Sequence, residues 1–147
     1  MVLFVCTGNT CRSPMAAAIL KNKFEKKGTN TLVMSCGVFA HGSGASIGAI
    51  QAMESFSISL EGHIPTQINK KEVGDADIIL TMTMAHKDFV TQNFPTAAHK
   101  TYTICEYVTG DQKDISDPFG GSTQIYIQTA KELQELIDQL DFLKEEK

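Results

Sequence analysis

The sequence MVLFVCTGNTCRSP, residues 1–14, decides the fold. Its first five residues are an apolar run, which is typical of a strand buried on both faces of a parallel sheet. Ser13 and Pro14 favour the start of a helix, Ser13 as the capping residue and Pro14 in the first turn. We therefore expect a strand, a loop and the amino terminus of a helix in immediate succession, with Cys6 where the strand ends.

The predicted loop has the features of an anion site. Its N–H groups converge beside the positive end of a helix, and Gly8 permits a tight turn. Arg12 adds a planar set of donors that suits two phosphate oxygens. We expect this field to lower the pKa of Cys6 and to make its thiolate a nucleophile toward phosphorus. A buried structural cysteine beside a surface arginine is the alternative, which the surrounding pattern disfavours.

Composition bounds the class of protein. The 147 residues suit a single domain, 1–147, and 42% hydrophobic with 20% charged residues is ordinary for a globular chain. The net charge of -4 and the pI near 5.5 argue against nucleic acid or an anionic membrane as partner. Because no apolar stretch is long enough to span a bilayer and no signal-peptide pattern is present, we expect a cytoplasmic location.

The cysteines fit a reducing compartment. Cys6, Cys11, Cys36 and Cys105 are expected to be free thiols, the last two in the core. Their spacing lacks the paired clusters of a structural zinc site, and we expect no metal or other cofactor.

Hydrophobic periodicity predicts an α/β fold. Strands are expected at 1–5, 32–36, 76–81 and 100–104, and helices at 13–27, 46–56, 68–73, 85–94 and 122–140, with a turn or short helix at 106–110 and a frayed end at 144–147. This alternation predicts an open, twisted, four-stranded parallel sheet with helices on both faces. Ile47 and Ile125 are expected on the buried faces of their helices. Ligands of such folds bind beyond the carboxyl ends of the strands, where Cys6 lies.

The spacing Cys6-x5-Arg12-Ser13 is the signature of cysteine-dependent phosphatases. The chain resembles the low-molecular-weight protein tyrosine phosphatase family in CTGNTCRSP (6–14), Ala45-Ser46, Gly62-His63, residues 76–82 and Asp117-Pro118. The resemblance implies that Cys6 attacks phosphorus to form a phosphocysteine, while Asp117 protonates the leaving group and later deprotonates water. It also implies a phosphate-binding loop, composed with Cys6 and Arg12 of Thr7, Gly8, Asn9, Thr10, Cys11 and Ser13.

Other residues of the family pattern are expected to support the loop. Ser13 can donate to the Cys6 sulfur besides capping the helix, and Asn9 is expected to fix the loop conformation. Ser46 and His63 belong to the same support. Cys11 has two open interpretations: a partner that traps oxidised Cys6 as a disulfide, as in the family, or a small apolar filler. Asp117 before Pro118 is, by itself, also a common turn former.

Two positions depart from the tyrosine-specific pattern and resemble the bacterial protein arginine phosphatase branch. Thr10 stands where tyrosine phosphatases carry an apolar residue, and Asp117-Pro118 is followed by Phe119 and Gly120 instead of two aromatic residues. A guanidinium needs acceptors such as the Thr10 hydroxyl and the Asp117 carboxylate, and Phe119 can stack on its plane. We expect a phosphatase for phosphoarginine in proteins, with phosphotyrosine as the alternative substrate.

Two other classes compete with this interpretation. An arsenate reductase needs additional cysteines downstream, and none occurs between residues 53 and 98. A non-catalytic phosphoanion-binding module has no use for Cys6 and Asp117 together. The expected partners are phosphorylated proteins as substrates of a monomeric enzyme.

Overall fold

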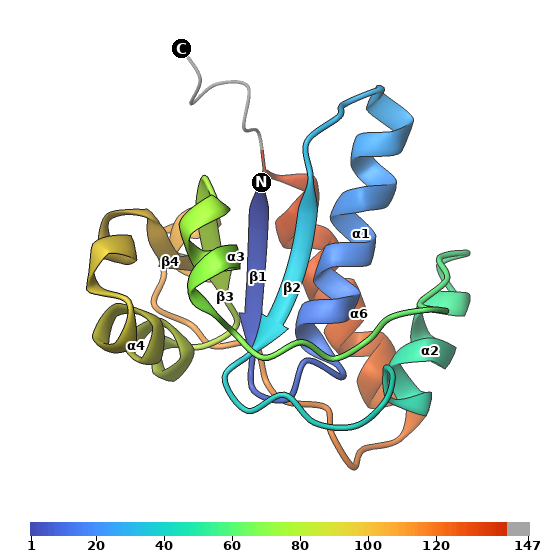
Figure 1. Cartoon of the computed structure of the whole chain (residues 1–147). Coiled ribbons are helices and arrows are strands. Elements are labelled where there is room, and N and C mark those ends of the chain that lie inside the picture. Colours follow the sequence, from blue (N-terminus) through green and yellow to red (C-terminus); the bar gives the residue numbers. More distant parts are fainter. Residues whose placement is uncertain (141–147) are drawn as a thin grey trace.

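A computed structural model describes residues 1–140 of the chain (Figure 1). Four strands, β1 (Val2–Cys6), β2 (Val33–Gly37), β3 (Ile78–Thr81) and β4 (Thr101–Thr103), form one parallel sheet in the order β2-β1-β3-β4. The predicted four-stranded parallel sheet is therefore confirmed. The frayed end expected at 144–147 lies outside the described residues.

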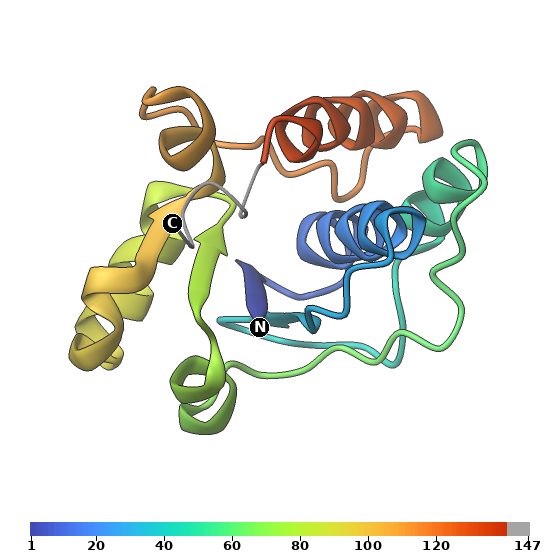
Figure 2. The same ribbon diagram turned by 90° about the horizontal axis from the view of Figure 1, so that it is seen from above.

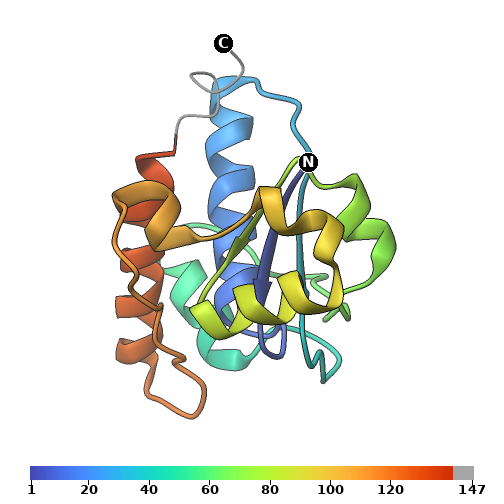
Figure 3. The same cartoon turned by 90° about the vertical axis from the view of Figure 1, so that its left-hand side faces the viewer.

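Helices cover both faces of the sheet (Figures 2 and 3). They are α1 (Arg12–Lys27), α2 (Ile47–Glu54), α3 (Lys70–Asp75), α4 (Met84–Asn93), the 3₁₀ helix η1 (Pro95–Lys100), α5 (Ile104–Thr109) and α6 (Thr123–Asp138). One core cluster joins Phe4 and Leu80 to α1, α2, α5 and α6, and the other joins Leu3 and Ile79 to α3, α4 and η1. Because alternate residues of β1 enter opposite clusters, the strand is buried on both faces, as its apolar run predicts.

Three local expectations were wrong. Helix α1 begins at Arg12, one residue early, and Ser13 does not cap it because the Ser13 hydroxyl bonds elsewhere. Ile47 is 74% exposed and Ile125 is 45% exposed, so neither faces the core. Both lie in the first turn of a helix, where Ser46 and Ser122 cap the amino termini at the molecular surface.

The short helix expected at 68–73 begins two residues later, because the side chain of Asn69 caps the amino terminus of α3.

The sheet topology brings the loops that follow the strands together at the carboxyl edge of the sheet. Strand order reverses at β1, which pairs with β2 on one side and β3 on the other, and such a switch point opens a crevice at the carboxyl ends. Val38 N donates to Cys6 O at 3.0 Å, and Ile115 N donates to Met82 O at 2.9 Å. These bonds fasten the segments after β2 and α5 to the ends of β1 and β3, where the predicted site lies.

Candidate active site

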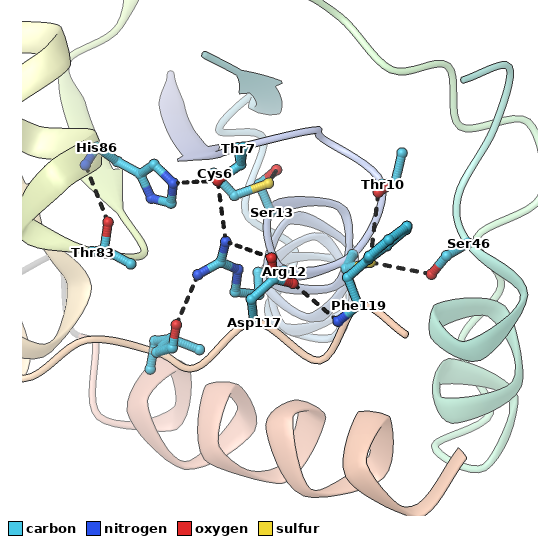
Figure 4. Close-up of polar contacts among 12 residues, drawn as sticks. Cys6, Thr7, Thr10, Arg12, Ser13, Ser46, Thr83, His86, Asp117 and Phe119 are labelled. Atoms are coloured by element: carbon cyan, nitrogen blue, oxygen red, sulfur yellow. Dashed lines mark hydrogen bonds and ion pairs between the residues drawn. The ribbon is translucent and has the colours of Figure 1, made fainter. Parts of the chain in front are cut away.

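A pocket of about 220 Å³ opens at the carboxyl end of β1 (Figure 4). Its lining is composed of Cys6, Thr7, Gly8, Thr10, Cys11, Arg12, His41, Asp117 and Phe119. Most of the residues predicted for the site therefore share one cavity. Asn9, Ser13, Ser46 and His63 are not in the lining but contact residues that are, or the loop that bears them.

Cys6 lies at the floor of the pocket and is 2% exposed. Its Sγ is 2.8 Å from the Ser13 Oγ, which agrees with the expected contact between the two side chains. Burial raises the pKa of the Cys6 thiol, while the hydrogen bonds from Ser13 and Asn9 and the charge of Arg12 oppose that effect. The predicted lowering was wrong because it counted the charge and the amide dipoles but omitted the loss of water around the sulfur.

Asn9 holds the loop in a conformation that non-glycine residues rarely adopt. Its φ is 58°, in the left-handed region, and its side chain is fully buried. The Asn9 amide nitrogen donates to Ser13 Oγ at 2.8 Å and to Ser35 Oγ at 2.9 Å, and its Oδ1 accepts from Thr66 N at 2.8 Å. His63 Nε2 donates to the Asn9 carbonyl at 2.7 Å. Asn9 and His63 therefore both contact the loop, but the Asn9 side chain bonds to Ser13, Ser35 and the distant Thr66 N instead of the neighbouring backbone that we expected.

Arg12 is buried beside Cys6, with its guanidinium fixed by protein groups. Its Nη1 donates to the carbonyl of Ile115 at 2.8 Å, and its Nη2 lies 3.4 Å from Thr7 Oγ1. The same Nη2 is 3.6 Å from Asp117 Oδ2. The cation thus faces the pocket from a set orientation, as required to grip an oxyanion.

Asp117 approaches from the loop before α6 and is half-exposed. While Oδ2 faces Arg12, Oδ1 accepts a hydrogen bond from Phe119 N at 3.0 Å. The carboxylate therefore forms the turn expected of an Asp-Pro pair and also lines the pocket. The turn interpretation of Asp117 is thus confirmed, while its role as general acid stays a prediction.

Phe119 and His41 form the mouth of the pocket. Their rings meet edge to face, with centroids 6.3 Å apart and an interplanar angle of 86°. His41 N donates to Gly8 O at 3.3 Å, and a Cβ at Gly8 would lie 2.5 Å from His41 Nε2. Gly8 therefore leaves room for the His41 ring against the loop. Sequence patterns gave no sign of His41, which lies in a Gly-rich segment.

Cys11 lies in a polar cluster behind Thr10. Its Sγ is 3.3 Å from Ser46 Oγ, 3.6 Å from Thr10 Oγ1 and 3.6 Å from the Tyr126 hydroxyl. These contacts connect the loop to α2 and α6. Ser46 acts both as the cap of α2 and as a loop contact, whereas Tyr126 was missed because its helix reads only as a core-facing amphipathic segment.

His86 is a second residue that the sequence did not reveal. It is buried on α4, and its Nε2 lies 2.8 Å from Thr7 Oγ1, the group that Arg12 also contacts. Its Nδ1 is buried without a hydrogen-bond partner among residues 1–140. Burial first, then the charge of Arg12, lowers the pKa of His86 to about 4, so the ring is neutral near pH 7.

Within the described residues, no group of three or more His, Cys, Asp or Glu side chains could hold a metal ion. The four thiols are all free and buried. Over residues 1–140, none of the helices combines the length and apolarity that crossing a membrane demands.

Fold and pocket together define a phosphatase with a cysteine in its phosphate-binding loop. The chain belongs to the low molecular weight phosphotyrosine protein phosphatase family, which residues 1–147 match. It is 45% identical over 140 residues to the protein-arginine-phosphatase of Bacillus subtilis (strain 168), covering 95% of this chain and 93% of that protein.

Solved structures agree with this assignment. The YwlE arginine phosphatase from Geobacillus stearothermophilus has a TM-score of 0.91 and 44% identity, covering 99% of this chain and 93% of its own. A YwlE arginine phosphatase mutant with a phosphorylated active-site serine has a TM-score of 0.90 at 44% identity, covering 94% of this chain and 91% of its own. The family resemblance inferred from the sequence is confirmed.

Replacing Ser13 by alanine is expected to raise the pKa of Cys6 further, because the hydroxyl is the leading group that opposes burial. A hydrogen bond to a charged group is worth about 1.5–3 kcal/mol, or roughly 1–2 pH units. The rate of alkylation by iodoacetate, followed against pH, measures the shift. Ser55→Ala is the matched control because the Ser55 hydroxyl donates to the carbonyl of Ala52 in α2 and does not line the pocket. An unchanged Cys6 titration would contradict the assignment.

Histidine 86 is expected to make stability fall in mild acid. Its pKa is lowered in the folded chain from 6.5 to about 4, so between these values the unfolded chain binds more protons. The free energy of unfolding therefore falls as pH drops through this window, by at most about 1.4 kcal/mol per pH unit for one group. Urea unfolding of His86→Gln should show a shallower loss than wild type, while the exposed control His99→Gln should follow wild type. Parallel curves would disprove the assignment.

Proposed function

We propose that this phosphatase hydrolyses phosphoarginine in proteins through a phosphocysteine intermediate. One observation carries the proposal: Cys6, Arg12, Thr10 and Asp117 line a single pocket, which offers a nucleophile, an oxyanion clamp and acceptors for a guanidinium. The relatives named as arginine phosphatases support the same substrate class.

In the first step the Cys6 thiolate attacks phosphorus in line with the departing nitrogen. The S–P bond forms as the P–N bond breaks, and the nitrogen takes a proton from the Asp117 carboxyl, so that a guanidinium leaves. Arg12 and the loop N–H groups hold the equatorial oxygens, where charge accumulates in the transition state. Substrate binding must be accompanied by transfer of the Cys6 proton to solvent, from which the thiol regains a proton after phosphate leaves. Ser13, Asn9 and Arg12 are the groups that favour the anion.

In the second step water attacks the phosphocysteine. Asp117, now ionised, takes a proton from the water, the S–P bond breaks, and inorganic phosphate forms. The departing Cys6 thiolate is stabilised by the Ser13 hydroxyl, 2.8 Å from Sγ. One carboxyl group thus serves as acid and then as base, and the proton balance closes over the cycle.

Selectivity is assigned to Thr10 and Phe119. Both line the pocket, Thr10 from the loop and Phe119 from the turn after Asp117. A phosphotyrosine phenol would leave the Thr10 hydroxyl without a donor, whereas a guanidinium supplies one. The Phe119 ring, 65% exposed at the mouth, offers a face on which a flat cation can stack.

We further propose that the enzyme works as a monomer in the cytoplasm. Cys11 as a partner for oxidised Cys6 stays a prediction: both thiols are free in this structure, and Cys11 contacts Ser46 and Tyr126.

Cys6→Ser is expected to abolish turnover, and Asp117→Asn to lower kcat on a phosphoarginine peptide by about 10²–10⁴-fold. The loss for Asp117→Asn should be much smaller with p-nitrophenyl phosphate, whose leaving group needs no protonation. Steady-state assays on both substrates test this, with Asp111→Asn, an exposed acid of the same loop, as the control. Equal losses on both substrates would argue against Asp117 as the acid.

Thr10→Ile is expected to shift preference from phosphoarginine toward phosphotyrosine. Removing the hydroxyl takes away an acceptor for the guanidinium, so the ratio of kcat/KM values should fall by at least about tenfold. Thr10→Ser, which keeps the hydroxyl, should retain the wild-type ratio. Phosphoarginine and phosphotyrosine peptides of one sequence provide the measurement. An unchanged ratio in Thr10→Ile would overturn the specificity while leaving the phosphatase assignment intact.

A further inference from the structure

A second hollow, larger than the active-site pocket, lies behind the phosphate-binding loop. Its volume is about 420 Å³, and it is formed by α1, by Ser35 of β2 and by the segment 57–63 that follows α2. Figures 1 and 2 show that segment passing beside α1 and then toward β2. We call this hollow the rear cavity; the proposed reaction does not use it.

The rear cavity is lined by acidic and basic side chains around an apolar strip. Pro14, Ala17 and Ala18 of α1 give it an apolar strip. The charged side chains of Lys21, Glu25 and Glu61 also line it, and none of these three takes part in a salt bridge within residues 1–140. Two carboxylates and one ammonium around an apolar strip match a short aliphatic molecule that carries a strong cation at one end and a carboxylate at the other.

The wall of the rear cavity is bonded to the active site through Asn9. Ser35 and His63 both line the cavity, and both bond to Asn9, at 2.9 Å and 2.7 Å. On its other side the Asn9 amide donates to Ser13 Oγ, which lies 2.8 Å from Cys6 Sγ. Two hydrogen bonds therefore separate the wall from the hydroxyl that stabilises the thiolate.

We propose that the rear cavity binds a small amphoteric molecule with a guanidinium or ammonium group and a carboxylate, and that its occupancy increases the reactivity of Cys6. Bonds from the ligand to the free positions of Ser35 and His63 restrain both side chains where they hold Asn9. The Ser13 hydroxyl then stays directed at the sulfur. The proposal is independent of the phosphoryl-transfer reaction, because neither binding nor thiol reactivity requires turnover.

Free L-arginine is the probe, because it carries both charges on an aliphatic stem. Titration calorimetry is carried out with saturating orthovanadate, which fills the active-site pocket, so that remaining heat reports the rear cavity. We expect arginine to bind, and agmatine, which lacks the carboxylate, to bind about tenfold more weakly. Loss of arginine binding when vanadate is present would overturn the proposal.

Variants of the residues that line the rear cavity test whether arginine binds there. Glu25→Gln combined with Glu61→Gln should weaken arginine about tenfold, and Ala18→Trp should block it by filling the cavity. Lys131→Gln, an exposed lysine on α6 outside the cavity, should bind as wild type does. Far-UV circular dichroism checks that Ala18→Trp is folded, and the glutamine pair stands as the second test if it is not. Wild-type affinity in the glutamine pair would overturn the site.

Alkylation of Cys6 tests the coupling. Without vanadate, saturating arginine should speed iodoacetate labelling of wild type by about fivefold, the lower end of usual coupling strengths. Arginine should not change the rate of iodoacetate labelling in the variant that combines Glu25→Gln with Glu61→Gln. Arginine bound in the active-site pocket would shield Cys6, so slower labelling would overturn the proposal, and an unchanged rate with proven binding would overturn its coupling half.

Discussion

The left-handed backbone of Asn9 is the constraint on which the rest of the site depends. A non-glycine residue pays about 1–2 kcal/mol for this conformation, and its buried amide must also find partners. Ser13, Ser35 and Thr66 bond to this side-chain amide, and His63 bonds to the Asn9 carbonyl, from α1, β2 and the segment before α3. Three separate parts of the fold thus hold one peptide turn in the loop that follows Cys6.

Burial of ionisable groups is the cost of this arrangement. Cys6 and Arg12 are both nearly inaccessible, and desolvation opposes the charged form of the thiol. The fold compensates with fixed partners: a carbonyl for Nη1, a threonine hydroxyl for Nη2 and a serine hydroxyl for Sγ. These dipoles are in place before substrate arrives, so little reorganisation is needed when a phosphoryl group enters.

The local parts of the site could be predicted from the sequence, whereas its long-range contacts could not. Cys6 and Arg12 follow from a strand, a loop and a helix start within fourteen residues, and the apolar runs predict the parallel sheet. His86 and Tyr126 reach the loop from helices distant in sequence, and no local pattern marks them. Ser13 illustrates the limit: its position suits a helix cap, but tertiary contacts with Asn9 and Cys6 use its hydroxyl instead.

The orientation of Arg12 implies that the ion pair between Arg12 and Asp117 would be exchanged for a contact with the phosphoryl group during the proposed reaction. The bond from Nη1 to the Ile115 carbonyl orients the guanidinium so that Nη2 is the end that faces Asp117 Oδ2 at 3.6 Å. A phosphoryl group above Cys6 competes for that same end with the stronger charge. In the proposed reaction Asp117 would then leave the cation while its Oδ1 keeps the hydrogen bond from Phe119 N. The carboxyl would then lie beside the leaving group, where it is proposed to donate its proton.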